Sequence, residues 1–301
     1  MITKKMRLLL NLAGFAFSLV AVVFIVIKLI AYGTEVEFSL FAPLIFPLLL
    51  LSVIYGASNV LLSLAWRDLL KRFGLTIGIF SAIQIYGISL LAKYIPGNIF
   101  QFVGRQALGL SLGMPGGPLA KSSIWEIGAL VFSGSLFGLL SIPVIKDVIT
   151  IDLALIGFLL IVTLTLWTSY HLISRWVTQA ICWYIIFLLL SGTIFWAVVS
   201  QLEPARSFSE SEFLIIASAY VLAWLAGLIT PGAPAGVGIR EIVLYALLHS
   251  YIAEVDLLTA IVSSRIVTVF GDLFFYVFSL LSSFRKSGLF VAGKNTRFTN
   301  S

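Results

Sequence analysis

Long apolar runs are the feature that most constrains how this chain can fold. A helix needs about 20 apolar residues to cross the hydrocarbon core of a bilayer, and several stretches meet or approach that length. Only 11% of the residues are charged, against about 25% in soluble domains. The sequence therefore predicts an all-α polytopic membrane protein with about six full spans, near residues 8–32, 41–65, 119–144, 151–169, 178–201 and 257–284.

The first run is interpreted as a span and not as a secretory signal. The apolar stretch from Leu8 to Ile30 is too long for a signal peptide, and no small-residue cleavage site follows it. The single cysteine, Cys182, offers neither a disulfide framework nor a metal site. The sequence also has no Walker-type nucleotide-binding motif and no H-E-x-x-H. We therefore expect no metal and no cofactor.

Basic and acidic loops alternate along the chain, which predicts its orientation. Because lysine and arginine are enriched in cytoplasmic loops, both termini are expected in the cytoplasm, in a multi-pass protein of the cell (inner) membrane. The alternation holds only if two interrupted regions, residues 76–112 and 212–252, return to the side from which they enter, as re-entrant helical hairpins. About eight to ten ordinary spans are the alternative, because short helices can tilt or cross incompletely.

Two segments of the interrupted regions resemble each other. LLAKYIPGNIFQFVGRQ ends at Gln106, and LAGLITPGAPAGVGIRE ends 135 residues later at Glu241. The same offset carries residues 8–32 and 41–65 onto apolar runs of the second half. The chain is therefore predicted to consist of two membrane repeats, residues 1–146 and 150–286, and a cytoplasmic basic tail, residues 287–301. Because each repeat has an odd number of full spans, the second is expected to be inverted, as in many secondary transporters.

Proline and glycine interrupt the helix in both segments. Proline removes a backbone donor and disfavours helix at the preceding residue, whereas glycine permits the turn. Irregular backbone at bilayer depth is tolerated only where protein shields it or where it lines a wet cavity, and the helix N-termini that follow suit an anion. The sequence thus predicts two hairpins that share a polar site, formed with Pro96, Gly97, Gly104, Pro231, Gly232, Gly236 and Gly238.

Charged side chains at membrane depth cost about 2.5–3.5 kcal/mol each, so each must have a partner or a function. Arg105 shares a helical face with Gln101, and a guanidinium can bind a phosphate through two hydrogen bonds. The alternative is that Arg105 pairs with Glu126, and Arg240 with a carboxylate, only to hold the hairpins together. The candidate substrate-binding residues are Lys93, Tyr94, Asn98, Gln101, Arg105, Arg240, Glu241 and Arg265.

Other interpretations of these residues stay open. Glu241 can bind a cationic group or form a salt bridge with Arg265. Glu126 and Asp272 are candidates for ion coupling or for structural pairing, and Lys93 with Tyr94 also fits an anchor at the membrane interface.

The two segments resemble the transmembrane flippase region of the bacterial lysylphosphatidylglycerol synthase family, and the resemblance extends over about residues 10–285. It implies movement of an aminoacylated lipid between leaflets. The span after the first motif departs from the family, because Glu126 is followed by Ile127 where the family often has arginine. No soluble synthase domain follows Phe284, so we expect the synthase chemistry to be absent. The matching residues are Lys93, Tyr94, Pro96, Gly97, Gly104, Arg105, Pro231, Gly232, Gly236, Gly238, Arg240, Glu241 and Arg265.

The leading hypothesis is a flippase that moves an anionic or aminoacylated phospholipid or a lipid-linked sugar through the polar site. One alternative is a membrane-embedded transferase with Glu126 or Glu241 as its base, and the other is a non-transporting membrane scaffold. The sequence favours a transporter over an enzyme and argues against a nucleic-acid partner. The expected partner is a membrane lipid; a homo-oligomer and a separate lipid-modifying enzyme are further candidates.

Overall fold

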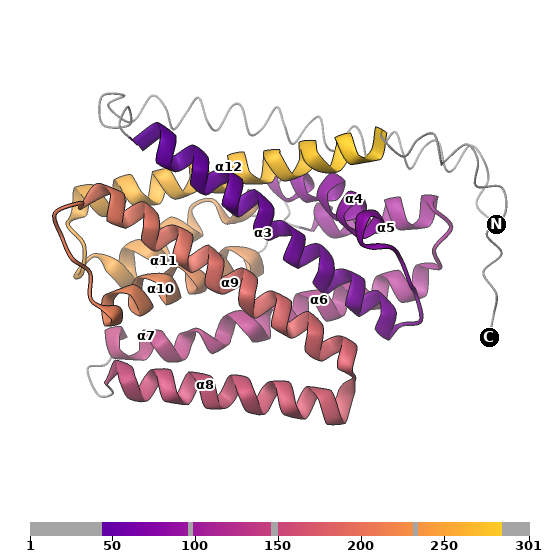
Figure 1. Ribbon diagram of the computed structural model, residues 1–301, viewed down its shortest axis with the longest axis horizontal. Coiled ribbons are helices and arrows are strands. Elements are labelled where there is room, and N and C mark those ends of the chain that lie inside the picture. The colour runs from indigo at the N-terminus through magenta and orange to yellow at the C-terminus, as the bar shows by residue number, and fades with distance from the viewer. Residues whose placement is uncertain (1–43, 96–98, 146–149, 231–233, 285–301) are drawn as a thin grey trace.

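The computed structural model describes residues 44–95, 99–145, 150–230 and 234–284, and this part of the chain is helical and contains no strand (Figure 1). Pro96, Gly97, Asn98, Pro231 and Gly232 lie outside the described residues, as do the predicted first span at residues 8–32 and the basic tail.

Six helices of the described residues are long and apolar enough to cross a membrane, as expected for a multi-pass membrane protein. They are α3 (Ile45–Arg72), α6 (Gly116–Leu136) with the start of α7 (Gly138–Ile145), α8 (Ile151–Thr168) with the π-helical turn η3 (Ser169–Ile173), α9 (Arg175–Leu202), α10 (Glu210–Ile229) and α12 (Glu254–Phe284).

The two interrupted regions differ in helix length. In the first, α4 (Ile79–Leu90) continues into the 3₁₀ turn η2 (Leu91–Tyr94), and together they are too short to count among the six. In the second, α10 has 20 residues and is one of the six, although the sequence analysis assigned residues 212–252 to a returning hairpin. The physical reason is that α10 starts early: Ser209 caps it in a capping box with Glu212, so a full-length helix precedes the break.

The same order of elements occurs twice. A long helix, a second apolar helix, a break, a short helix and another long helix follow one another as α3, α4, η2, α5 (Phe100–Ser111) and α6. The order returns as α9, α10, η4 (Pro234–Gly236), α11 (Ile239–Leu248) and α12. The neighbours correspond as well: α4 packs on α5 as α10 packs on α11, and α3 contacts α6 as α9 contacts α12. The inverted relation between the two units stays a prediction.

Helix α3 packs against both α9 and α12 and lies between them (Figure 1). Its crossing with α12 is close, because a Cβ atom added at Gly56 would lie 2.7 Å from the carbonyl oxygen of Gly271. Small residues at a crossing let two membrane helices approach closely and gain van der Waals contact. The glycine pair therefore brings α12, with Arg265 and Asp272, next to the polar residues of α3.

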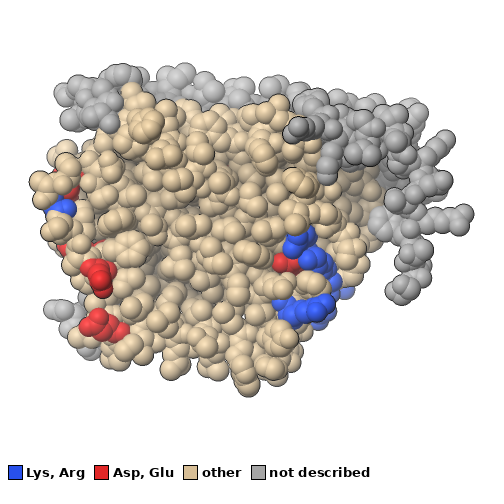
Figure 2. Space-filling model, viewed as in Figure 1, with Lys and Arg blue, Asp and Glu red and all other residues tan. Residues whose placement is uncertain are grey.

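Charge is separated between the two ends of the helices (Figure 2). Lysine and arginine gather where α3 ends and α9 begins, and acidic residues gather at the other end of α9 and at the start of α12. At the acidic end, hydrogen bonds to Glu203 and then to Glu212 raise the pKa of Arg206 above its ordinary value.

Candidate functional site

The two interrupted regions meet in the interior of the protein. The turn η2 packs against η4, and Leu91, Tyr94 and Ile95 form a small apolar cluster with Ala235 and with Tyr276 of α12. Residues far apart in the sequence are thereby placed around one point. The described residues that flank the two breaks thus lie close together, and a shared binding site there stays a prediction.

Backbone conformation explains two of the predicted hairpin glycines. Gly236 and Gly238 have φ values of 74° and 89°, a left-handed region that side chains other than glycine's rarely adopt. A Cβ atom at Gly236 would also lie 2.6 Å from the Cα atom of Gly227 in α10, so the turn presses against the preceding helix. Gly104 has a different position: it lies within α5 and faces α4, where a Cβ atom added to it would lie 3.5 Å from the Cβ atom of Ser89.

A first buried polar group surrounds Asp272, which is fully buried in α12. Its Oδ2 atom lies 2.6 Å from Lys93 Nζ and accepts a hydrogen bond of 2.5 Å from the Tyr94 hydroxyl. Its Oδ1 atom accepts from Asn59 Nδ2 of α3 at 3.3 Å. Lys93 and Tyr94 therefore both contact a buried carboxylate of α12.

A second group consists of Arg105, Glu126 and Tyr86. Arg105 Nη1 donates to Glu126 Oε2 at 2.5 Å, and the Tyr86 hydroxyl donates to Glu126 Oε1 at 3.0 Å. The guanidinium also lies over the Tyr86 ring, 3.9 Å from its centroid. Arg105 is 1% exposed, yet its Nε and Nη2 atoms have no hydrogen-bond partner within the described residues.

A third group ties α11 to α12. Arg265 Nε lies 2.6 Å from Glu241 Oε1, and the two other nitrogens of this guanidinium donate to the carbonyl oxygens of Ala235 and Gly236. Glu241 Oε2 in turn accepts from the backbone N–H of Gly238 at 2.7 Å. The pairing that the sequence analysis gave as the alternative for Glu241 is thus present, and it fastens the η4 turn to α12.

Arg240 differs from the other three guanidinium and ammonium groups of the site. It lies over the Trp224 ring at 5.5 Å from the centroid, and its Nε atom has no hydrogen-bond partner among the described residues. In the described part of the chain no carboxylate pairs with it. Its aliphatic stem and Nε pack on Gly227, where a Cβ atom would lie 2.8 Å away.

A cavity of about 30 Å³ lies between these groups. Tyr86, Lys93, Gln101 and Glu126 line it from the first half of the chain, and Arg240 lines it from the second half. A volume of this size holds about two water molecules. Arg105 is not among the described lining residues, but it contacts Glu126 and Tyr86, which are.

The structure also shows polar residues that the sequence analysis did not single out. Asn59 and Tyr55 of α3 line the cavity, and Asn59 was detectable as an amide in the middle of a predicted span. Asp68, 1% exposed, accepts hydrogen bonds from Arg67, Lys71 and the Trp183 indole. It was overlooked because it lies in a basic stretch that the sequence analysis treated only as an orientation signal.

No protein-family model matches this sequence, no curated protein matches it, and no solved structure matches its fold.

Proposed function

We propose that this protein is an integral membrane lipid transporter, a flippase-like protein, that moves a lipid with an anionic head group between leaflets. The substrate class is an anionic or aminoacylated phospholipid or a lipid-linked sugar, as the resemblance to the flippase region of lysylphosphatidylglycerol synthases implies. The observation that carries the proposal is Arg240, a half-buried arginine whose buried Nε atom and whose charge have no described hydrogen-bond or carboxylate partner, beside a polar cavity where the two interrupted regions meet.

An unpaired guanidinium at this depth is costly unless something compensates its charge. A phosphate would do so, because guanidinium groups bind phosphate oxygens through two parallel hydrogen bonds. Arg105, which contacts the lining residues Glu126 and Tyr86, has two further nitrogen atoms without described hydrogen-bond partners. The site therefore has more cationic donor capacity than the described carboxylates use.

The size of the cavity limits what it can hold in this conformation. About 30 Å³ accommodates water but not a phosphorylated head group, so a head group can enter only after the cavity widens. Transport then requires the two units to move apart alternately towards each leaflet, while the acyl chains remain in lipid.

The alternative of a transferase receives less support. A general base needs a carboxylate within reach of the substrate hydroxyl, and both candidate carboxylates accept hydrogen bonds from arginines: Glu126 from Arg105 and Glu241 from Arg265. A scaffold that does not transport lipid would not need an unpaired Arg240. Replacing Arg240 with a neutral residue therefore distinguishes a transporter from a scaffold.

The decisive experiment measures lipid movement in liposomes that contain the purified full-length protein. A panel of head-group-labelled lipids is used, with phosphatidylglycerol, lysylphosphatidylglycerol and a polyprenyl-phosphate lipid among them. We expect the wild type to accelerate translocation of at least one of these lipids, and Arg240→Gln to reduce that rate about tenfold or more, as for the loss of a charge-assisted contact.

The matched control is Arg206→Gln, the same substitution at the acidic end, where Arg206 pairs with Glu203. This variant should transport like the wild type. Rates that equal those of protein-free liposomes for every lipid of the panel would refute the proposal.

A further inference from the structure

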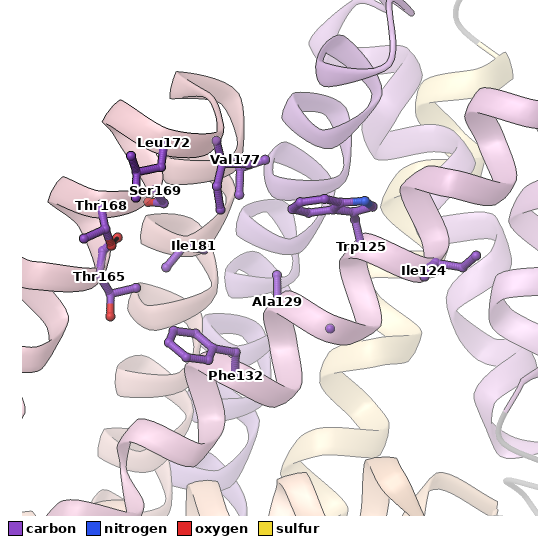
Figure 3. A pocket seen from close by; sticks show the side chains of 12 residues that line it. Ile124, Trp125, Ala129, Phe132, Thr165, Thr168, Ser169, Leu172, Val177 and Ile181 are labelled. Carbon is purple, nitrogen blue, oxygen red and sulfur yellow. Dashed lines mark hydrogen bonds between the residues drawn. The ribbon is translucent and has the colours of Figure 1, made fainter.

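A second, larger depression lies away from the central cavity, on the outside of the helix bundle. It has a volume of about 500 Å³ and runs between α6, the end of α8 with η3, and the start of α9 (Figure 3). Trp125, Ala129 and Phe132 of α6 form one wall, and Thr168 and Leu172 lie opposite. We call this depression the lateral groove.

The walls of the lateral groove are apolar in character. The Thr168 hydroxyl donates to the carbonyl oxygens of Leu164 and Thr165 in its own helix, and Ser169 exchanges a hydrogen bond with Thr178. These two hydroxyl groups are therefore satisfied without a ligand. Helix α8 is also the least buried of the six candidate spans, with 11% of its most apolar window buried. A groove beside such a helix is open to the hydrocarbon of the bilayer.

Cationic side chains surround the mouth of the lateral groove. Trp125 contacts Phe73 at the end of α3, with ring centroids 6.3 Å apart, and Arg72 lies over that phenylalanine. On the α9 side, Lys71 and Arg175 both lie 4.4 Å from the Trp176 ring, which precedes the lining residue Val177.

Most of this positive charge is not neutralised by the protein. Asp68 is the carboxylate that the described residues offer at this mouth, and it is buried and bound to Arg67 and Lys71. Arg72 and Arg175 are exposed, as is Lys121, one turn before Trp125 in α6. In the described part of the chain none of these three forms an ion pair. The mouth therefore complements an anion, whereas the groove behind it complements a hydrocarbon chain.

We infer that the lateral groove binds an anionic phospholipid from the leaflet at the basic end of the protein. One acyl chain occupies the groove between Trp125 and Leu172, and the phosphate lies among Arg72, Arg175 and Lys121. Basic residues near a membrane surface attract anionic lipids with about 1 kcal/mol per residue. The apolar groove thus favours an acyl chain, and the basic residues at its mouth favour an anionic head group.

The groove is independent of the proposed transport site. Trp125 and Glu126 are neighbours in α6, and successive side chains of an α-helix point about 100° apart. Trp125 faces the groove, while Glu126 lines the central cavity. The groove can therefore bind a lipid whether or not lipid passes through the central cavity. An experiment can thus refute lipid binding in the groove without refuting transport, and the reverse.

The test is native mass spectrometry of the purified full-length protein after equilibration with equal amounts of phosphatidylglycerol and phosphatidylcholine. The wild type should retain mainly phosphatidylglycerol. The double variant Arg72→Gln/Arg175→Gln should lose this preference, by roughly fivefold for each arginine. Arg240→Gln, in the central cavity, should keep the adduct and its selectivity.

Two glycines supply a matched pair for the groove itself. A Cβ atom added at Gly128, which lines the groove, or at Gly157 in α8, which does not, would meet no atom within 4 Å. Gly128→Leu should therefore reduce retention of both lipids severalfold, whereas Gly157→Leu should not. Thr168→Trp fills the groove from the facing wall and serves as a second variant if Gly128→Leu does not fold.

Three outcomes would overturn the inference. The wild type could retain the two lipids equally, or the groove-filling variants could retain as much phosphatidylglycerol as Gly157→Leu. In the third outcome, filling the groove would dissociate an oligomer while lipid retention stayed constant, and the groove would then be an interface between copies of the chain.

Discussion

Arg105 and Arg240 occupy the same place in two similar segments but have different surroundings. Arg105 is paired with Glu126 in the core, whereas Arg240 lies over Trp224 with no described carboxylate partner. The sequence could show that each arginine needs an explanation, because charge at membrane depth is costly. It named Glu126 as a possible partner of Arg105, and that pair is present, but it could not decide between pairing and substrate binding, since this depends on how α5 and α6 are rotated against each other.

This difference predicts that neutral substitutions of the two arginines change the free energy of unfolding differently. Arg105→Gln leaves Glu126 as a buried, unpaired carboxylate and should lower the free energy of unfolding by about 3–5 kcal/mol. The double variant Arg105→Gln/Glu126→Gln should recover most of that loss. Arg240→Gln removes an unpaired charge and should leave stability unchanged or slightly higher. Reversible unfolding in detergent measures all three, and an equal loss for the two single arginine variants would contradict the assignment.

Asp272 provides a second prediction at the level of single residues. Tyr94→Phe removes only the hydroxyl that donates to this carboxylate and keeps the ring in place. Hydrogen bonds to charged groups contribute about 1.5–3 kcal/mol, so unfolding should require correspondingly less denaturant. Tyr170→Phe, at an exposed position, is the control and should have no effect. If Tyr94→Phe were equally silent, the hydrogen bond to Asp272 would not form.

That contact also marks the limit of sequence reasoning, because Tyr94 and Asp272 are 178 residues apart. Motif spacing identified both residues as candidates but contained no information that they touch.

At the level of helices, the apolar runs located the described spans but not their ends. The second predicted span ended at residue 65, where charged residues begin, whereas α3 continues to Arg72. It continues because Asp68 is buried against Lys71 and Trp183. It stops where Gly74 adopts a left-handed conformation and the N–H groups of Gly74 and Leu75 bond back to Lys71 and Leu70. The burial of Asp68 and the turn at Gly74 therefore set the end of α3, and neither is visible in the hydropathy of the sequence.

The crossing of α3 and α12 gives the prediction at this scale. Gly56→Ala places a methyl group against the backbone of Gly271, and the two helices must separate to accept it. We expect a loss of about 1–3 kcal/mol in unfolding free energy and weaker contact between Asn59 and Asp272. Gly157→Ala, where the methyl group meets nothing, should be neutral or stabilising by up to about 1 kcal/mol. Similar melting of the two variants would show that the crossing tolerates more space than the structure indicates.

For the molecule as a whole, the separation of charge between the two ends predicts orientation. The positive-inside rule places the end with Arg72 and Arg175 in the cytoplasm. In a Cys182→Ala background, Glu254→Cys should react with a membrane-impermeant maleimide on intact cells, and Arg72→Cys only after permeabilisation. The reverse pattern would invert the topology and would also move the lateral groove to the outer leaflet.

The helical membrane class that the sequence predicted is present in the described residues, whereas the two repeats and their shared site stay predictions. The sequence did not predict the lateral groove, because its lining residues form an ordinary apolar pattern within separate helices. These residues line one depression only because α6, α8 with η3, and α9 are arranged around it (Figure 3).

The small volume between the two repeats has a quantitative consequence for ligand binding. A cavity of about 30 Å³ admits no head group, so a lipid can enter only a less populated conformation. Its measured dissociation constant then exceeds the intrinsic one by the inverse of that population, and a state present at about 1% weakens apparent affinity hundredfold. Equilibrium titrations of this protein should therefore give weak binding even for a substrate that it moves quickly, and substitutions that favour the open state should tighten binding without touching the lipid.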